Sequence, residues 1–300
     1  VEEWAKNILH REGEEEGWQE ISCNKFVRKK FNRAGTTTCY LKWMKDSRGR
    51  FSKPDDDEKE YPCLKCFATI NAPLDDVCTY LSQEIRIQEY NDLIEGNRDL
   101  EEITPHSKIC WSQCPQILFV KPRDFVTFCH HRWGKDGGQI MVNQACEHPS
   151  SPGVASEKDG NVCRAYALRG ANFLSVDPDD PNKTKFSMVC HADPGGGLPT
   201  WAARTAVNAV APIEPFKLFH KIDKGVQIAG PFTSSNEASS IRSSKPAGLS
   251  SIGYACFWPN GGGIHDAPTS GDSSMQKGTS DQLGKDSAVV QTLPPRGTSS

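Results

Sequence analysis

Six strand-like segments follow one another between Asp99 and Asp193, and short turn-forming stretches separate several of them. Turn signals occur at residues 135–138, 150–153 and 177–182, which are rich in Gly, Pro, Asp and Ser. Strands that short turns join pair as neighbours in an antiparallel sheet. The sequence therefore predicts an α+β protein built around an antiparallel meander.

Helical and strand-like patterns also flank the meander. Before it, we expect a helix over about residues 1–20, strands at 24–31, 39–45 and 63–70, and a helix over 74–85. After it, Pro199 occupies the favoured first position of a helix. Because Pro212 and Pro215 interrupt that helix, we expect a kink or a short break before the pattern resumes over residues 214–222.

Composition divides the chain near Val226, since aromatic and β-branched residues are concentrated before it and Ser, Gly, Thr and Pro dominate after it. We expect one folded domain over residues 1–226 and a disordered tail over 227–300. An apolar island in the tail, centred on Tyr254 to Trp258, leaves two interpretations open. One is a low-complexity linker and the other is a short docking motif.

Charge and cysteine content limit the function classes. A formal net charge of −3 argues against nucleic acid as a partner. The acidic runs at 11–17 and 54–60 lack the spacing of a calcium loop. Twelve cysteines, most of them in apolar strand-like segments, indicate reduced thiols in an intracellular compartment. We expect a monomer in the cytoplasm, or in a plastid if a targeting peptide is missing from this chain.

Motifs for catalysis and metal binding are weak. Cys63 and Cys66 have the spacing of a redox or zinc motif, but in a strand their side chains would point to opposite faces. His130 and His131 are adjacent in a strand, so one of them faces the interior. No nucleophile elbow, metalloprotease helix or phosphate-binding loop motif occurs. We therefore predict neither a metal nor a cofactor.

Four spaced motifs resemble those of the START domain, the lipid-transfer domain named for steroidogenic acute regulatory protein, in the form common in plants and algae. They read ITPHSKICW at 103–111, KPRDFVTFCHHRW at 121–133, VCRAYALRGANFL at 162–174 and HADPGGGLPTW at 191–201. The resemblance implies a helix-grip fold, in which a curved antiparallel sheet wraps around a long C-terminal helix and encloses a lipid cavity. It also implies a lipid ligand and transient contact with a membrane surface.

The resemblance nominates residues that line the cavity. Thr127, Cys129 and His131 share one face of their strand, and the family analogy turns that face toward the ligand. Many sterol-binding members hold an arginine and an acidic residue at the positions of Cys129 and Cys110. Both charges are absent here, which argues against a sterol anchored by charged groups. The segment DPGGGLPTW at 193–201 resembles phosphatidylcholine-transfer members more than sterol carriers, so the resemblance favours a phospholipid.

Phospholipid carriers of this family bind phosphate with arginines and choline with an aromatic cage, which suits guanidinium geometry and cation–π attraction. By strand position, the resemblance assigns these roles to Arg164, Tyr166 and Trp111.

Three consecutive glycines, Gly195, Gly196 and Gly197, join the last strand of the meander to the next helix. Glycine supplies backbone freedom, and the resemblance makes this segment the hinge of a gate through which lipid enters. Pro199 and Trp201 would then fix the start of the moving helix, with Trp201 also contacting ligand.

Two other functions remain open. An enzyme of the wider superfamily, similar to a polyketide cyclase, would need an ionisable residue poised in the cavity, for which His131 and His191 are candidates. A regulatory lipid sensor would use the same pocket, with the tail carrying the output.

Overall fold

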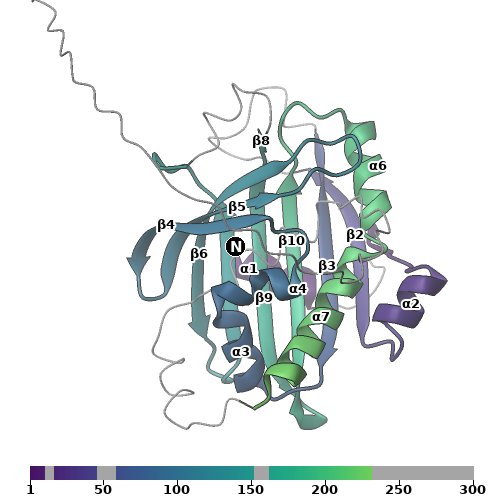
Figure 1. The fold of residues 1–300 in the computed structure, drawn as a ribbon, viewed down its shortest axis with the longest axis vertical. Helices are drawn as coiled ribbons and strands as arrows, with labels where there is room; N and C mark the ends of the chain where they lie inside the picture. Colours follow the sequence, from purple (N-terminus) through teal and green to yellow (C-terminus); the bar gives the residue numbers. More distant parts are fainter. Residues whose placement is uncertain (11–16, 46–58, 152–161, 232–300) are drawn as a thin grey trace, which may run out of the picture. The chain divides into compact units, whose positions relative to one another are not determined.

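The structure is a computed structural model that describes residues 1–10, 17–45, 59–151 and 162–231 (Figure 1). The tail beyond residue 231, including the apolar island, lies outside these residues, as does most of both acidic runs.

A single antiparallel sheet forms the centre of the fold, as the meander predicts. Its order is β1-β2-β3-β10-β9-β7-β6-β5-β4, and β8 pairs in parallel with β6. The sheet is open, with β1 and β4 at its edges. The strands are β1 (Gln19–Glu20), β2 (Thr37–Lys45), β3 (Glu60–Ile70), β4 (Gly96–Thr104), β5 (Ser107–Cys114), β6 (Arg123–Trp133), β7 (Gln139–Ala145), β8 (Cys163–Arg164), β9 (Tyr166–Asp177) and β10 (Asp180–Asp193).

Helices lie on both sides of this sheet, with α3, α4 and α7 in front of it in Figure 1 and α1 behind it. The helical segments are α1 (Glu2–Leu9), α2 (Lys25–Phe31), α3 (Leu74–Ser82), the 3₁₀ turn η4 (Glu84–Arg86), α4 (Ile87–Tyr90), α6 (Thr200–Val210) and α7 (Glu214–Ala229). No helix in this part of the chain is long and apolar enough to cross a membrane.

The helix break expected near the prolines is confirmed. Helix α6 ends at Val210, and α7 begins at Glu214 with Pro215 in its first turn, where a missing N–H leaves no hydrogen bond unmade. Pro199 is the N-cap of α6 rather than its first helical residue. The helical segment after Pro199 is therefore two helices, of which α7 is the long C-terminal one.

Two local predictions are wrong. The first helix ends at Leu9 rather than near residue 20. Residues 25–31, predicted as a strand, form helix α2. Asn24 caps it, since its Oδ1 accepts a hydrogen bond of 2.8 Å from the backbone N–H of Val27, and basic residues in the last turn suit the negative end of the helix dipole.

The two faces of the sheet have different coverings. The face toward α7, here called the inner face, shares one apolar core with Phe216, Phe219 and Ile222 of that helix. The opposite, outer face shares a smaller core with α1 through Ala5. Cys66 belongs to the inner core and Cys63 to the outer one, so the two thiols diverge as predicted.

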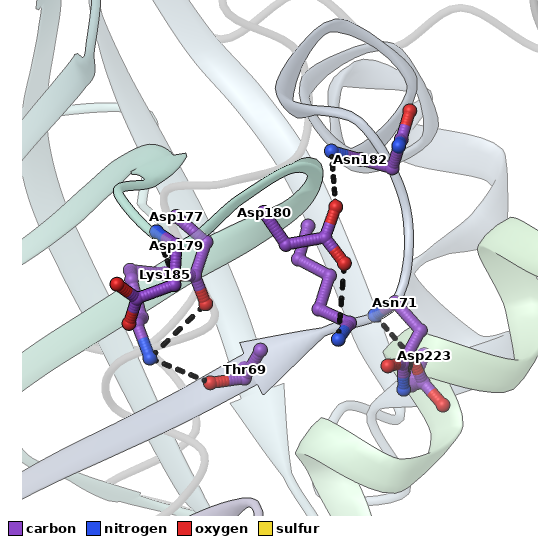
Figure 2. A network of polar contacts seen from close by, with 9 residues as sticks. Thr69, Asn71, Asp177, Asp179, Asp180, Asn182, Lys185 and Asp223 are labelled. Atoms are coloured by element: carbon purple, nitrogen blue, oxygen red, sulfur yellow. Dashed lines mark hydrogen bonds and ion pairs between the residues drawn. The ribbon is translucent and has the colours of Figure 1, made fainter.

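Polar contacts fix one end of α7 to the sheet (Figure 2). The carboxylate of Asp223 accepts hydrogen bonds from the backbone N–H and the side-chain amide of Asn71, at 2.7 and 3.1 Å, just beyond the end of β3. Nearby, Lys185 contacts Asp177 at 3.1 Å and the Thr69 hydroxyl at 3.2 Å. These contacts join β3, β9, β10 and α7 at the end of the sheet where β9 turns into β10.

Candidate functional site

Strand β6 presents alternate residues to the inner face. Phe125 belongs to the inner core, so Thr127, Cys129 and His131 point to the same side, and all four are buried. His130 points the other way, where its Nδ1 lies 2.8 Å from the Ser107 hydroxyl. As the alternation predicts, one histidine of the pair faces the interior.

The thiol of Cys129 in this strand lies beside the thiol of Cys110 in the neighbouring strand β5. The Sγ atoms of Cys110 and Cys129 are 3.4 Å apart, and both approach the Thr127 hydroxyl. Burial raises the pKa of the Cys129 thiol well above its usual value, so the thiol is neutral. Cys110 and Cys129 therefore place two thiols at the positions where, by the family resemblance, sterol carriers have a charge pair.

His131 is a neutral histidine. Its Nε2 lies 3.5 Å from Nδ1 of His106, and the two rings meet edge to face with centroids 4.9 Å apart. Burial, together with the positive charge that His106, His130 and Lys108 would contribute, lowers the pKa of His131 to about 4. The charge of Lys108 is compensated by Asp99, at 2.8 Å.

Sequence reasoning missed Asn172 and Gln139 among the buried polar residues of the inner face. Asn172 lies between Met141 and Met188, which belong to the inner core, and Gln139 is paired with Leu174 of that core. Neither Oδ1 nor Nδ2 of Asn172, nor Oε1 of Gln139, has a hydrogen-bond partner among the residues that the structure describes. The period-2 pattern that runs through Leu174 was the signal that placed Asn172 inside.

Trp111 and Arg164 lie elsewhere. Arg164 forms two hydrogen bonds with the buried Asp124 carboxylate, at 2.9 and 3.0 Å, and the indole N–H of Trp111 donates to the same carboxylate at 2.9 Å. Asp124 precedes Phe125, so this cluster lies on the outer side of β6. The structure therefore does not bring these two residues together with His131.

The glycine segment is a tight turn whose last residue, Gly197, has free space around it. Gly195, Gly196 and Gly197 all have φ between 62° and 63°, a region that disfavours other residues. The N–H of Gly195 donates to the Asp193 carboxylate at 2.8 Å, and Arg123 donates to the Pro194 carbonyl at 2.9 Å. Polar contacts therefore hold the start of the segment.

Space around the three glycines differs. A Cβ atom on Gly195 would lie 1.9 Å from the Arg164 carbonyl oxygen, and one on Gly196 would lie 3.2 Å from Cys163. A Cβ atom on Gly197 would meet nothing within 4 Å. Space for a side chain therefore exists at Gly197, next to α6, and not at Gly195, so Gly197 is the glycine at which the predicted hinge would meet the least steric hindrance.

A pocket of about 700 Å³ opens beside this segment. Residues from the start of β3, the end of β10, the glycine turn and α6 line it, and Arg164 and Tyr166 form part of its wall. It is the place in the described structure where the proposed gate residues and Tyr166 meet.

Exposed apolar side chains gather next to α6. Ile117 and Val120 are buried and hydrogen-bond to each other across a tight turn, which turns Leu118 and Phe119 outward. Leu118 adopts a φ of 50°, an unfavourable value for a branched side chain. Trp201 is 68% exposed and Phe119 is 56% exposed, with ring centroids 6.3 Å apart. Leu118, Phe119 and Trp201 are called the apolar tip below.

Trp201 thus points away from the inner face.

Within the described ranges no group of three or more His, Cys, Asp or Glu side chains is arranged to hold a metal ion.

Comparisons with known proteins agree with this geometry. The profile of the START domain matches residues 59–217. Human StAR-related lipid transfer protein 5 is similar in structure, with a TM-score of 0.56 at 17% identity over 76% of this chain and 95% of that one. Human STARD10 has a TM-score of 0.53 at 15% identity over 76% of this chain and 80% of that one. No curated protein matches the chain significantly by sequence.

The glycine turn predicts a graded response to alanine. Gly197→Ala meets only the unfavourable φ, which costs about 1–2 kcal/mol, whereas Gly195→Ala adds a clash with the Arg164 carbonyl and destabilises the protein more. Chemical denaturation measures both. Gly35→Ala is the matched control, since Gly35 has a φ of 67° and open space. Equal losses for Gly195→Ala and Gly35→Ala would contradict the assignment of a packed turn.

His131 predicts a pH dependence of stability. Its folded pKa of about 4 lies below its ordinary value near 6.5, so between these two pH values the unfolded chain binds a proton that the folded protein does not. The unfolding free energy should therefore fall as pH is lowered through this window. His131→Gln should reduce the difference in bound protons between the unfolded and folded states by up to about one in this pH window. Urea denaturation at several pH values measures this difference from the slope of the unfolding free energy. An unchanged slope would show that the imidazole is not buried in its neutral form.

Proposed function

This chain belongs to the START domain family, and from that premise we propose that it binds one lipid between the inner face and α7 and carries it between membranes without altering it. Apolar burial supplies the affinity, at about 25 cal/mol for each Å² of lipid surface removed from water. The inner core, to which the sheet, α3 and α7 all contribute, is the apolar region that the lipid would enter.

The observation that carries the transfer proposal is the position of the apolar tip. Helix α6 lines the 700 Å³ pocket through Thr200 and Ala203, and the same helix carries Trp201 of the tip. A lipid leaving a bilayer needs an apolar path, and exposed aromatic side chains insert favourably at the membrane interface. Contact of the tip with a bilayer would place that membrane beside the pocket.

The proposal of a non-catalytic protein rests on the histidines. A general base works best with a pKa near the operating pH, whereas that of His131 is about 4. His191 lies on the outer side of β10, with its ring stacked near Trp4 of α1 at a centroid distance of 6.2 Å. Neither arrangement favours cyclase chemistry.

The choice of a phospholipid over a sterol rested on Arg164, Trp111 and the missing charge pair. The Cys110–Cys129 pair still argues against a sterol anchored by charged groups. The guanidinium of Arg164 is engaged by Asp124, which removes the main support for a phosphate anchor. The proposal therefore stands for a lipid in general, and the polar group of that lipid is taken up below.

A reducing compartment is part of the proposal. None of the eleven cysteines in the described part of the chain forms a disulfide, and most of them are buried. Free thiols persist in the cytosol, which supports a cytoplasmic place of action.

Lipid retention tests the function directly. The full chain is incubated with vesicles of mixed phospholipid, sterol and diacylglycerol, separated from them, extracted and analysed by mass spectrometry. We expect about one lipid per protein, and accelerated movement of that lipid from donor to acceptor vesicles. Retention of no lipid, with turnover of a small aromatic ketide that His131→Gln abolishes, would establish the enzyme alternative instead.

The apolar tip predicts a selective loss of transfer. Phe119→Ser with Trp201→Ser removes the exposed aromatic surface, so the transfer rate should fall about tenfold or more, which corresponds to roughly 1.4 kcal/mol of membrane contact. Lipid bound at equilibrium should change little, because neither side chain lies on the inner face. Ile228→Ser is the control, since Ile228 is 85% exposed on α7 away from the tip. Equal transfer by the double variant and by this control would exclude the tip as the membrane contact.

A further inference from the structure

Three polar side chains lie close together on the inner face. His131 of β6 is paired with Met141 of β7, and Met141 is paired with Asn172 of β9. Gln139 lies two residues before Met141, which makes it a diagonal neighbour of both His131 and Asn172, at about 7–8 Å. These three residues are called the polar triad. They span three strands, and therefore about 10 Å of the sheet.

The triad contains polar atoms without protein partners. Nδ1 of His131, Oε1 of Gln139 and both amide atoms of Asn172 are buried, and none has a hydrogen-bond partner in the described residues. Asn172 is 0% exposed. Each buried polar atom without a partner costs about 1–3 kcal/mol, and native proteins keep few of them. Four such atoms on one patch form a polar site whose hydrogen-bond partners the described residues do not supply.

No formal charge accompanies the triad. His131 is neutral at physiological pH, because its pKa is about 4. Lys108, whose charge acts on His131, is paired with Asp99 at 2.8 Å. The Cys129 thiol is neutral as well. A charged headgroup would find no opposite charge here, and burying an uncompensated charge is strongly unfavourable.

We propose that the polar triad binds the headgroup of an uncharged lipid that carries both hydrogen-bond donors and acceptors, such as the glycerol group of a diacylglycerol. This inference rests on the proposed function and names its ligand class. Asn172 offers one donor and one acceptor, Gln139 an acceptor, and the Nδ1 of His131 either role according to its tautomer. A hydroxyl donates to an amide oxygen, and an ester carbonyl accepts from Nδ2 of Asn172.

Other headgroups fit this set less well. A phosphate or carboxylate accepts only, so it would face the carbonyl oxygens of Asn172 and Gln139 without a proton between them. A choline group has no N–H to donate. The single hydroxyl of a sterol is too small to reach both His131 and Asn172 across three strands. The surrounding Met141 and Met188 are adaptable side chains that accommodate an acyl chain beside the headgroup.

Competitive loading tests the assignment. The full chain is incubated with vesicles that contain equal amounts of palmitoyl-oleoyl glycerol, palmitoyl-oleoyl phosphatidylcholine, palmitoyl-oleoyl phosphatidic acid and cholesterol, and the retained lipids are quantified by mass spectrometry. We expect the diacylglycerol to exceed each other lipid at least tenfold. Asn172→Leu should lower its retention about tenfold, the effect of one lost hydrogen bond. Gln139→Met should also lower the retention of diacylglycerol.

A stability comparison separates a binding role from a structural one. Asn172→Leu removes two unpartnered atoms, so it should raise the melting temperature of the lipid-free protein. Asn32→Leu is the matched control, because Asn32 is also buried and both its amide atoms bond to the Thr37 backbone, at 2.8 and 3.1 Å. This control should lower the melting temperature and leave lipid preference unchanged.

The outcomes distinguish this inference from the proposed function. Retention of phosphatidylcholine, phosphatidic acid or cholesterol at the level of diacylglycerol or above would overturn the ligand class and leave lipid binding standing. A melting temperature lowered by Asn172→Leu as much as by Asn32→Leu would show that Asn172 is a structural residue, and would also overturn the inference. Retention of no lipid at all would overturn the proposed function itself.

Discussion

Aromatic packing joins α7 to the inner face of the sheet, where the rings of Phe219 and Phe186 meet edge to face with centroids 5.2 Å apart. Ile222 and Val226 extend the same contact along the helix. Helix α7 lies against β2 and β3 and helix α3 against β9 and β10, and together they cover the inner face, where the unpartnered polar atoms of the triad are buried. A lipid that reaches the triad must therefore replace part of the helix contact, because protein interiors have no spare volume of that size when closely packed.

The two ends of the helical cover are held differently. Near the turn between β9 and β10, Asp223 of α7 is bound by Asn71, and a neighbouring ion pair ties β10 to β9 (Figure 2). At the other end, α6 follows Gly197, which has open space around it, and its Arg204 forms a partly exposed ion pair of 3.1 Å with Glu60 of β3. Motion of α6, with α7 held at its far end, would uncover the inner face of the sheet beside the pocket and the apolar tip. In the proposed transfer, the tip, the pocket and the glycine turn would all take part in the passage of lipid.

Much of the fold follows from the sequence, because period-2 alternation is local. It places His131 inside and His130 outside, and it separates Cys63 from Cys66. Helix α2 was missed because its cap, Asn24, determines it more than its apolar pattern does.

The site was harder to predict than the fold. Arg164 lies in a strand-like segment of the sequence. Its contact with Asp124 depends on the parallel pairing of β8 with β6, which joins residues 40 positions apart. The alternation through Leu174 places Asn172 on the inner face, but only the sheet register shows that its neighbours on both sides, Met141 and Met188, are apolar. Long-range pairing decides both cases, and no short motif encodes it.

Photolabelling tests the central claim that a lipid lies between the inner face and α7. Diacylglycerol and phosphatidylcholine probes, each with a diazirine in the middle of an acyl chain, are loaded from vesicles, irradiated, and mapped by peptide mass spectrometry. The account predicts labels on β10 residues 180–193 and on α7 residues 214–229 for whichever probe is retained. Labels confined to the peptides of the apolar tip, with none on β10 or α7, would contradict it.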